Sequence, residues 1–270
     1  MVGIDQVLEK LSTVIDPDLK KDIVSMGMIK DLELNDGDLK FTLELTTPAC
    51  PFNVEIEDDV RKVIAELSDL KNFDLNVTAK VMEGRSLEAD TQMATVKNII
   101  GVASGKGGVG KSTVSLNLAL ALSQTGAKVG LLDADIYGPS IPLMLGMKDG
   151  SMEVEDNKLQ PADCNGLKVV SFGFFADQSN QAAIYRGPII SGILKQFLVD
   201  TNWSELDYLI VDLPPGTGDI PLTLAQTIPI TGILVITTPQ DVASNVAVKA
   251  VSMFEKLNVP IIGVIENMSH

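Results

Sequence analysis

The stretch from Gly105 to Thr113 has the residue types and spacing of a phosphate-binding loop. It reads G-K-G-G-V-G-K-S-T and fits the pattern G-x-x-x-x-G-K-[ST]. In such a loop the glycines let backbone N–H groups curl around the β- and γ-phosphates, Lys111 neutralises phosphate charge, and Ser112 ligates Mg²⁺. The pattern predicts a nucleoside triphosphatase whose nucleotide-binding residues are Gly105, Lys106, Gly107, Gly108, Val109, Gly110, Lys111, Ser112 and Thr113.

This chemistry requires the glycines to join a strand to a helix. Apolar residues at Val96, Ile99, Ile100 and Val102 precede the loop, and the apolar run 116–122 follows it at a spacing compatible with a helix. The sequence context therefore favours a phosphate loop over a glycine-rich turn without a ligand.

Three aspartates at strand ends complete the predicted site. Asp133 and Asp135 end the second strand, which we expect next to the phosphate loop, and Asp212 ends the apolar strand before the segment P-P-G-T-G. We expect Asp135 to orient the attacking water, and Asp133 (through water) and Asp212 to hold Mg²⁺ together with Ser112. Carboxylates also commonly end strands in solvated loops, and P-P-G-T-G is either a stiff turn or a loop that rearranges with the γ-phosphate.

Asn267 lies in the segment E-N-M after the last predicted strand. An amide at this position can pair bidentately with the edge of a purine. The residue type fits a capping asparagine equally well.

The composition limits the class of protein. With 270 residues, 45% of them hydrophobic, the chain can bury a sizeable core and is long enough for two domains. Its formal net charge of −15 disfavours non-specific attraction to polyanions, so we expect neither a nucleic-acid nor a membrane partner. The N-terminus lacks the order of a secretory signal, and no apolar run approaches the roughly 20 residues of a membrane span, so we expect a cytoplasmic protein.

Residues 1–82 are expected to form a small α+β domain. The turn N-D-G-D at 35–38 predicts a β-hairpin, the apolar positions between 60 and 70 repeat at helical spacing, and residues 75–81 alternate as a last strand. The polar, aperiodic segment 83–94 predicts a linker.

From residue 95 to residue 270, strands and helices alternate. The expected strands are 98–103, 129–133, 167–171, 208–212, 232–237 and 261–265. Continuous apolar strands belong in a parallel sheet covered on both faces. We therefore predict the α/β class, with a doubly wound, mostly parallel sheet of the P-loop NTPase type that binds its ligand at the C-terminal strand ends.

Together these motifs resemble the Mrp/ApbC family of P-loop ATPases, iron-sulfur cluster carriers related to MinD, ParA and the nitrogenase iron protein. The resemblance covers nearly the whole chain. It rests on the phosphate loop, D-A-D-I-Y-G-P-S from Asp133, R-G-P from Arg186, W-S-E-L-D-Y-L-I-V-D-L-P-P-G-T-G-D from Trp203, and E-N-M-S from Glu266. The N-terminal unit also resembles the small domain that accompanies iron-sulfur assembly factors, with D-P-D-L at Asp16 and T-P-A-C-P at Thr47.

The resemblance implies a homodimer in which Lys106 reaches the nucleotide of the partner subunit and stabilises charge on the transferring phosphoryl, as an arginine finger does. Lys106 thus joins Lys111 and Asp135 in the expected catalytic set. If the protein stayed monomeric with ATP, the alternative interpretation of Lys106 as a solvated loop lysine would be favoured. The resemblance also implies that Asn267 reads the base. Trp203 and Arg186 carry no implied chemistry and are expected to be a packed Trp and a surface Arg.

In the family a C-x-x-C pair follows E-N-M-S, and two subunits hold a [4Fe-4S] cluster on four thiolates. The sequence reaches His270 without this pair, so we expect it to be C-terminally truncated and assign the cluster to the full-length parent protein. The cysteines of this chain, Cys50 and Cys164, have no ligand spacing.

Cys50 precedes Pro51 and a predicted helix N-terminus, a setting that lowers the pKa of a thiol. We therefore take Cys50 as a candidate reactive thiol that helps to receive or pass iron or cluster. A partly buried structural thiol is the alternative.

The leading hypothesis is a carrier that binds and hydrolyses ATP, with ATP and Mg²⁺ as cofactors, and transfers iron-sulfur clusters to apoproteins. It works with assembly factors, and the bound nucleotide switches the geometry of its dimer. The alternative is a MinD/ParA-like positioning or regulatory ATPase, against which the acidic balance and the N-terminal domain argue. A small-molecule kinase such as dethiobiotin synthetase shares the lysine-bearing loop, but nothing in the sequence resembles its acceptor pocket. A non-catalytic scaffold requires negligible turnover.

Overall fold

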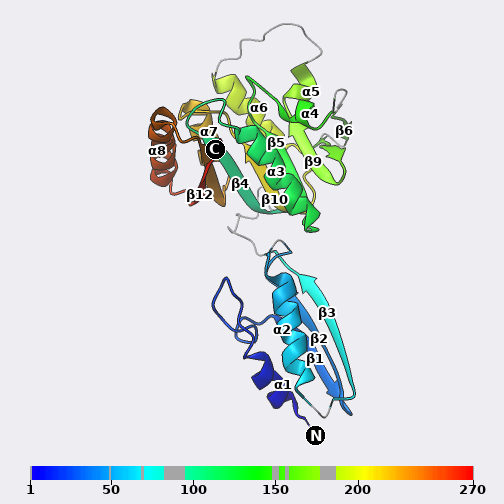
Figure 1. Cartoon of the computed structure of the whole chain (residues 1–270). Coiled ribbons are helices and arrows are strands. Elements are labelled where there is room, and N and C mark those ends of the chain that lie inside the picture. The colour runs from blue at the N-terminus through cyan, green and yellow to red at the C-terminus, as the bar shows by residue number, and fades with distance from the viewer. Residues whose placement is uncertain are drawn as a thin grey trace. The chain divides into compact units, whose positions relative to one another are not determined.

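The computed structural model describes residues 2–48, 50–67, 70–81, 95–147, 152–155, 158–176 and 187–269. The chain divides into two compact units, Met1–Met82 and Glu83–His270 (Figure 1). The predicted linker 83–94, Arg186 and His270 lie outside the described residues.

The first unit packs two helices against a three-stranded sheet (Figure 1). Strand β1 (Ile29–Asn35) runs antiparallel to β2 (Asp38–Leu45), which is parallel to β3 (Asn72–Ala79). Helices α1 (Ile4–Leu11) and α2 (Asn53–Ala65) supply the other half of the core. The odd-numbered residues of β2 are buried and the even-numbered ones are more exposed, which confirms the predicted alternation and the hairpin.

The second unit alternates strands and helices along the chain. Its elements are β4 (Val96–Ser104), α3 (Lys111–Gln124), β5 (Val129–Asp133), α4 (Ile141–Met144), β6 (Val154–Glu155), β7 (Lys158–Leu159), β8 (Ala162–Cys164), β9 (Leu167–Ser171), α5 (Gly173–Ala176), α6 (Gly187–Val199), β10 (Leu206–Asp212), α7 (Asp219–Thr227), β11 (Gly232–Thr237), α8 (Asp241–Lys256) and β12 (Ile261–Glu266).

Seven of these strands form one sheet in the order β12-β11-β4-β10-β5-β9-β8. All neighbouring pairs are parallel except β8 with β9, and β6 pairs with β7 in a separate two-stranded sheet. The predicted mostly parallel α/β sheet is confirmed, and the short strands β6, β7 and β8 were not foreseen from the sequence.

Each face of the sheet carries its own buried apolar cluster, because successive strand residues point to opposite faces. On β10, Leu209 and Val211 pack with residues of α6, α7 and α8, whereas Ile210 packs with residues of α3 and α4. Coverage on both faces explains why the strands read as continuous apolar runs. Trp203 belongs to the first cluster: it is buried, and its Nε1 donates to the Leu198 carbonyl at 3.1 Å.

The sheet order corrects one expectation about the site. We expected the second strand, which ends at Asp133, next to the strand of the phosphate loop, but β10 lies between β4 and β5. Asp212, at the end of β10, is therefore the carboxylate on the strand adjacent to the phosphate loop, and Asp133 lies one strand further along the same edge.

None of the helices in the described part of the chain combines the length and the apolar character needed to cross a bilayer.

Candidate functional site

The predicted phosphate loop lies between β4 and α3, at the C-terminal edge of the sheet. Gly105 must be a glycine because a Cβ there would lie 2.6 Å from the backbone carbon of Val246 and 2.8 Å from the nitrogen of Ala247, both on α8. Ser104 Oγ donates to the Lys106 carbonyl at 3.0 Å. The loop is thus held against α8 on one side and leads directly into α3 on the other.

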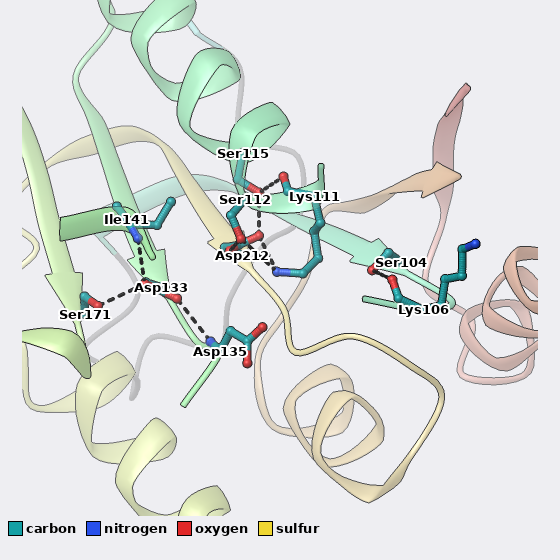
Figure 2. Close-up of polar contacts among 10 residues, drawn as sticks. All are labelled: Ser104, Lys106, Lys111, Ser112, Ser115, Asp133, Asp135, Ile141, Ser171 and Asp212. Carbon is teal, nitrogen blue, oxygen red and sulfur yellow. Dashed lines mark hydrogen bonds and ion pairs between the residues drawn. The ribbon is translucent and has the colours of Figure 1, made fainter. Parts of the chain in front are cut away.

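Asp212 lies at the centre of a hydrogen-bond network with the first two turns of α3 (Figure 2). Its Oδ1 accepts from Lys111 Nζ at 2.7 Å and from Ser115 Oγ at 2.7 Å, and its Oδ2 accepts from Ser112 Oγ at 2.6 Å. Lys111 is 6% exposed and Asp212 is fully buried. Removing either partner leaves an uncompensated buried charge, which costs about 3–5 kcal/mol.

Asp133 lies across from Asp212 in the parallel register of β5 and β10. Its Oδ1 accepts from the Asp135 amide at 3.2 Å, and its Oδ2 accepts from the Ile141 amide at 3.2 Å and from Ser171 Oγ at 3.0 Å (Figure 2). Asp133 therefore connects both ends of the 134–141 loop to the end of β9.

Burial, and then the neighbouring charge of Asp212, raise the pKa of Asp133 to about 6, and the three hydrogen bonds only partly oppose this. The pKa of Asp135 is also raised, mainly by burial. The Lys111 ammonium acts in the opposite direction and Asp212 adds to the rise. Asp135 thus lies within the electrostatic reach of both members of the central ion pair (Figure 2).

The Lys106 side chain points away from the Lys111–Asp212 pair (Figure 2). The structure of a single chain therefore brings Lys111, Ser112, Asp133, Asp135 and Asp212 together and leaves Lys106 outside this group. Asn267 lies on the other side of the loop, where its Nδ2 donates to the Val109 carbonyl at 2.9 Å.

The donor set fits Mg²⁺ with a nucleotide. Hard oxygen donors from Ser112 and Asp212 suit this ion, which usually keeps several waters and takes one or two protein ligands plus phosphate oxygens. Lys111 supplies the positive charge and the N-terminus of α3 supplies backbone N–H groups.

The described cysteines, unlike the oxygen donors above, do not form a ligand set for an iron-sulfur cluster. Cys50 belongs to the first unit and Cys164 to the second, and the described residues contain no group of three or more His, Cys, Asp or Glu side chains suited to a metal ion.

The expected low pKa of Cys50 is wrong in direction. The pKa of the Cys50 thiol is raised, first by burial and then by the Asp18 carboxylate, whose Oδ2 lies 3.6 Å from the sulfur; the hydrogen bond from the Phe52 backbone lowers it only in part. Helix α2 begins at Asn53, and its N-cap residue Phe52 supplies that backbone hydrogen bond, which burial and Asp18 outweigh.

Comparison with known proteins gives the relatives of this chain. The family described as "NUBPL iron-transfer P-loop NTPase" matches residues 95–270, and "Iron-sulfur cluster assembly protein" matches residues 4–73. The chain belongs to the iron-transfer P-loop NTPase family.

Two curated relatives carry the same name. The iron-sulfur cluster carrier protein of Synechocystis sp. is 47% identical over 274 residues, which cover 100% of this chain and 77% of the relative. That of Deinococcus radiodurans is 46% identical over 269 residues, 98% of this chain and 75% of the relative.

A solved structure, a nucleotide-binding protein from Archaeoglobus fulgidus in complex with ADP, is 41% identical with a TM-score of 0.58. The likeness covers 66% of this chain and 69% of that one.

Two serines of the site in this iron-transfer P-loop NTPase, Ser115 and Ser171, were not predicted from the sequence. Ser115 is fully buried one helical turn after Lys111, where its Oγ also lies 3.0 Å from the Lys111 carbonyl. A serine four positions after the motif lysine, on the helix face toward the sheet, was the available signal. Ser171 ends β9 at the same sheet edge as the aspartates, and strand-end position was its signal.

The raised pKa of Asp133 predicts a pH dependence of stability. Because the folded pKa of about 6 lies above the ordinary value of 3.8, the folded protein holds the proton more tightly, and the free energy of unfolding falls as pH rises through this window. Asp133→Asn cannot ionise, so its free energy of unfolding relative to wild type should rise by roughly 2–2.5 kcal/mol between pH 4 and pH 7. Denaturant unfolding in EDTA, followed by the fluorescence of Trp203, measures this.

Asp163→Asn is the matched control. The pKa of the exposed Asp163 is lowered, mainly by its hydrogen bond from Lys168, so its contribution to stability is present at high pH and is lost as pH falls. Parallel pH profiles for Asp133→Asn and wild type would contradict the assignment.

Proposed function

We propose that this protein binds and hydrolyses ATP with Mg²⁺, and that the nucleotide state of a homodimer governs the loading and release of an iron-sulfur cluster for apoproteins. The observation that carries the nucleotide part is the buried Lys111–Asp212 pair, bonded to Ser112 at the start of α3. The ADP complex of the Archaeoglobus fulgidus relative supports it.

Each residue has a defined part in hydrolysis. Lys111 and the loop amides bind the β- and γ-phosphates, and Ser112 and Asp212 hold Mg²⁺, with Asp133 acting through water. The metal neutralises charge on the phosphates when bound. Asp135 orients the water that attacks the γ-phosphate, and the leaving group is ADP. Asp133 also holds the 134–141 loop that carries Asp135, because its carboxylate accepts hydrogen bonds from the backbone amides of Asp135 and Ile141.

Lys106 acts in the partner subunit under this proposal. Its side chain points away from the site of its own chain, as expected of a residue that completes a second site in trans (Figure 2). The lysine then spreads charge on the transferring phosphoryl of the partner's nucleotide.

The cluster is cargo for this protein. The names of the two bacterial relatives, and the assembly-type match over residues 4–73, favour cluster transfer over the positioning role of MinD-like ATPases. Apoproteins and assembly factors are the partners, and the cytoplasm is the proposed compartment.

Asp135→Asn tests the hydrolysis step. The amide cannot accept a proton from water, so kcat should fall by about 10²- to 10⁴-fold while MgATP affinity changes little. In wild type, activity should fall as pH drops through the raised pKa of Asp135, because the protonated carboxyl no longer orients water as a base. Phosphate release and calorimetric titration measure the two quantities, with Asp163→Asn as the control. Unchanged kcat in Asp135→Asn would sink the assignment.

Cys50→Ser tests the cargo part, with Cys164→Ser as the matched control. Cys50 lies 3.6 Å from Asp18, and this thiol–carboxylate pair offers two groups to an incoming iron ion or cluster. The variants are made in the full-length parent protein that carries the C-x-x-C pair, reconstituted with cluster. Transfer to an apo-ferredoxin, followed by visible absorption, should slow several-fold in Cys50→Ser and stay unchanged in Cys164→Ser. Equal rates in both variants and wild type remove Cys50 from the proposal.

A further inference from the structure

The end of β12 is bonded directly to the phosphate loop. Asn267 Nδ2 donates to the Val109 carbonyl at 2.9 Å, and the Asn267 backbone amide donates to the Thr237 carbonyl at 2.8 Å. Asn267 thus has its main chain fixed to the end of β11 and its side chain fixed to the loop, across 158 sequence positions.

Gly110 makes this contact sterically possible. A Cβ on Gly110 would lie 2.3 Å from Asn267 Nδ2, which real Cβ contacts do not allow. The same residue has φ +85° and is the N-cap of α3, so the left-handed turn that opens the helix lies directly against the asparagine amide.

Met268 adds a second sign that the local backbone is set by this contact. Its φ is +58°, a left-handed conformation that costs free energy in a residue with a side chain. Its Cε lies 3.8 Å from the Cβ position of Gly110. The strained backbone directly after Asn267 is therefore maintained at the point where this segment meets the loop.

We propose that Asn267 is a positioning residue of the phosphate loop: its amide holds the Val109 carbonyl, sets the Val109–Gly110 turn, and so orients the loop amides toward phosphate. The inference rests on the proposed nucleotide binding and goes beyond the base-reading role expected from the sequence. The two roles are compatible, because the amide group has a second N–H and a carbonyl oxygen beyond the bond to Val109. The two roles differ in which contacts the loss of Asn267 weakens: those to the phosphates for a positioning role, and those to the base for a base-reading role.

Inorganic tripolyphosphate separates the two roles because it has phosphates and no base. In Asn267→Ala, a positioning role predicts that the affinity for Mg-tripolyphosphate falls by about tenfold, the net contribution of one hydrogen bond, and that the affinity for MgATP falls at least as much. Calorimetric titration measures both. Asn117→Ala is the matched control, because Asn117 also donates an amide N–H to a main-chain carbonyl, that of Thr113 at 2.8 Å, on the exposed side of α3. It should change neither affinity.

A loss confined to MgATP, or no loss with either ligand, would overturn the proposal. Asn267→Asp is the second variant, used if Asn267→Ala does not fold by circular dichroism. It has the same shape but no N–H to donate, and it is expected to lose at least as much affinity.

Hydrogen exchange of the ligand-free protein separates failure of this inference from failure of the proposed function. In Asn267→Ala the loop amides of 109–113 should exchange several-fold faster than in wild type, whether or not any nucleotide binds. If the wild-type protein binds no MgATP, the proposed function is wrong, and hydrogen exchange alone then tests the inference. Hydrogen exchange is also the deciding measurement if tripolyphosphate binds to wild type too weakly to measure. Unchanged exchange at 109–113 overturns the inference.

Discussion

The ion pair between Lys111 and Asp212 is the interaction on which the site depends. A buried ammonium and a buried carboxylate are each costly alone, and they are tolerated here because they lie 2.7 Å apart and share the hydroxyls of Ser112 and Ser115. The pair joins the first turn of α3 to the end of β10, and so links the helix that follows the phosphate loop directly to a central strand of the sheet. Under the proposed function, phosphate and Mg²⁺ would bind to groups that this network already orients.

The other contacts extend this arrangement along one edge of the sheet. The register that places Asp133 opposite Asp212 puts two carboxylates side by side. Burial and the charge of Asp212 both raise the pKa of Asp133, and hydrogen bonds from Ser171, Ile141 and Asp135 partly oppose this. At the other side of the loop, Asn267 contributes one further donor. The site is therefore built from strand ends of a single sheet, as is typical of doubly wound folds.

The sequence predicted the parts of the fold that local pattern controls. Apolar runs located the main strands, and N-D-G-D located the hairpin, because burial on both faces and turn conformation act over a few residues. The position of β10 between β4 and β5 is set by how crossover helices pack, which no local pattern contains. The phosphate-loop residues and strand-end aspartates were predictable from spacing, and their roles remain predictions. The direction of the Cys50 pKa was not predictable, since it depends on burial and on Asp18, far away in sequence.

The central claim is that Lys111, held by Asp212, binds the phosphates of a nucleotide. Calorimetric titration of MgATP into wild type and into folded Lys111→Ala tests it most directly, with Lys256→Ala on the exposed end of α8 as the control. We predict a saturable heat for wild type and the control, and an affinity weaker by about 100-fold or more for Lys111→Ala, because charge-assisted hydrogen bonds to phosphate are lost. Equal affinity in Lys111→Ala and wild type, or no heat with wild type, would contradict the account.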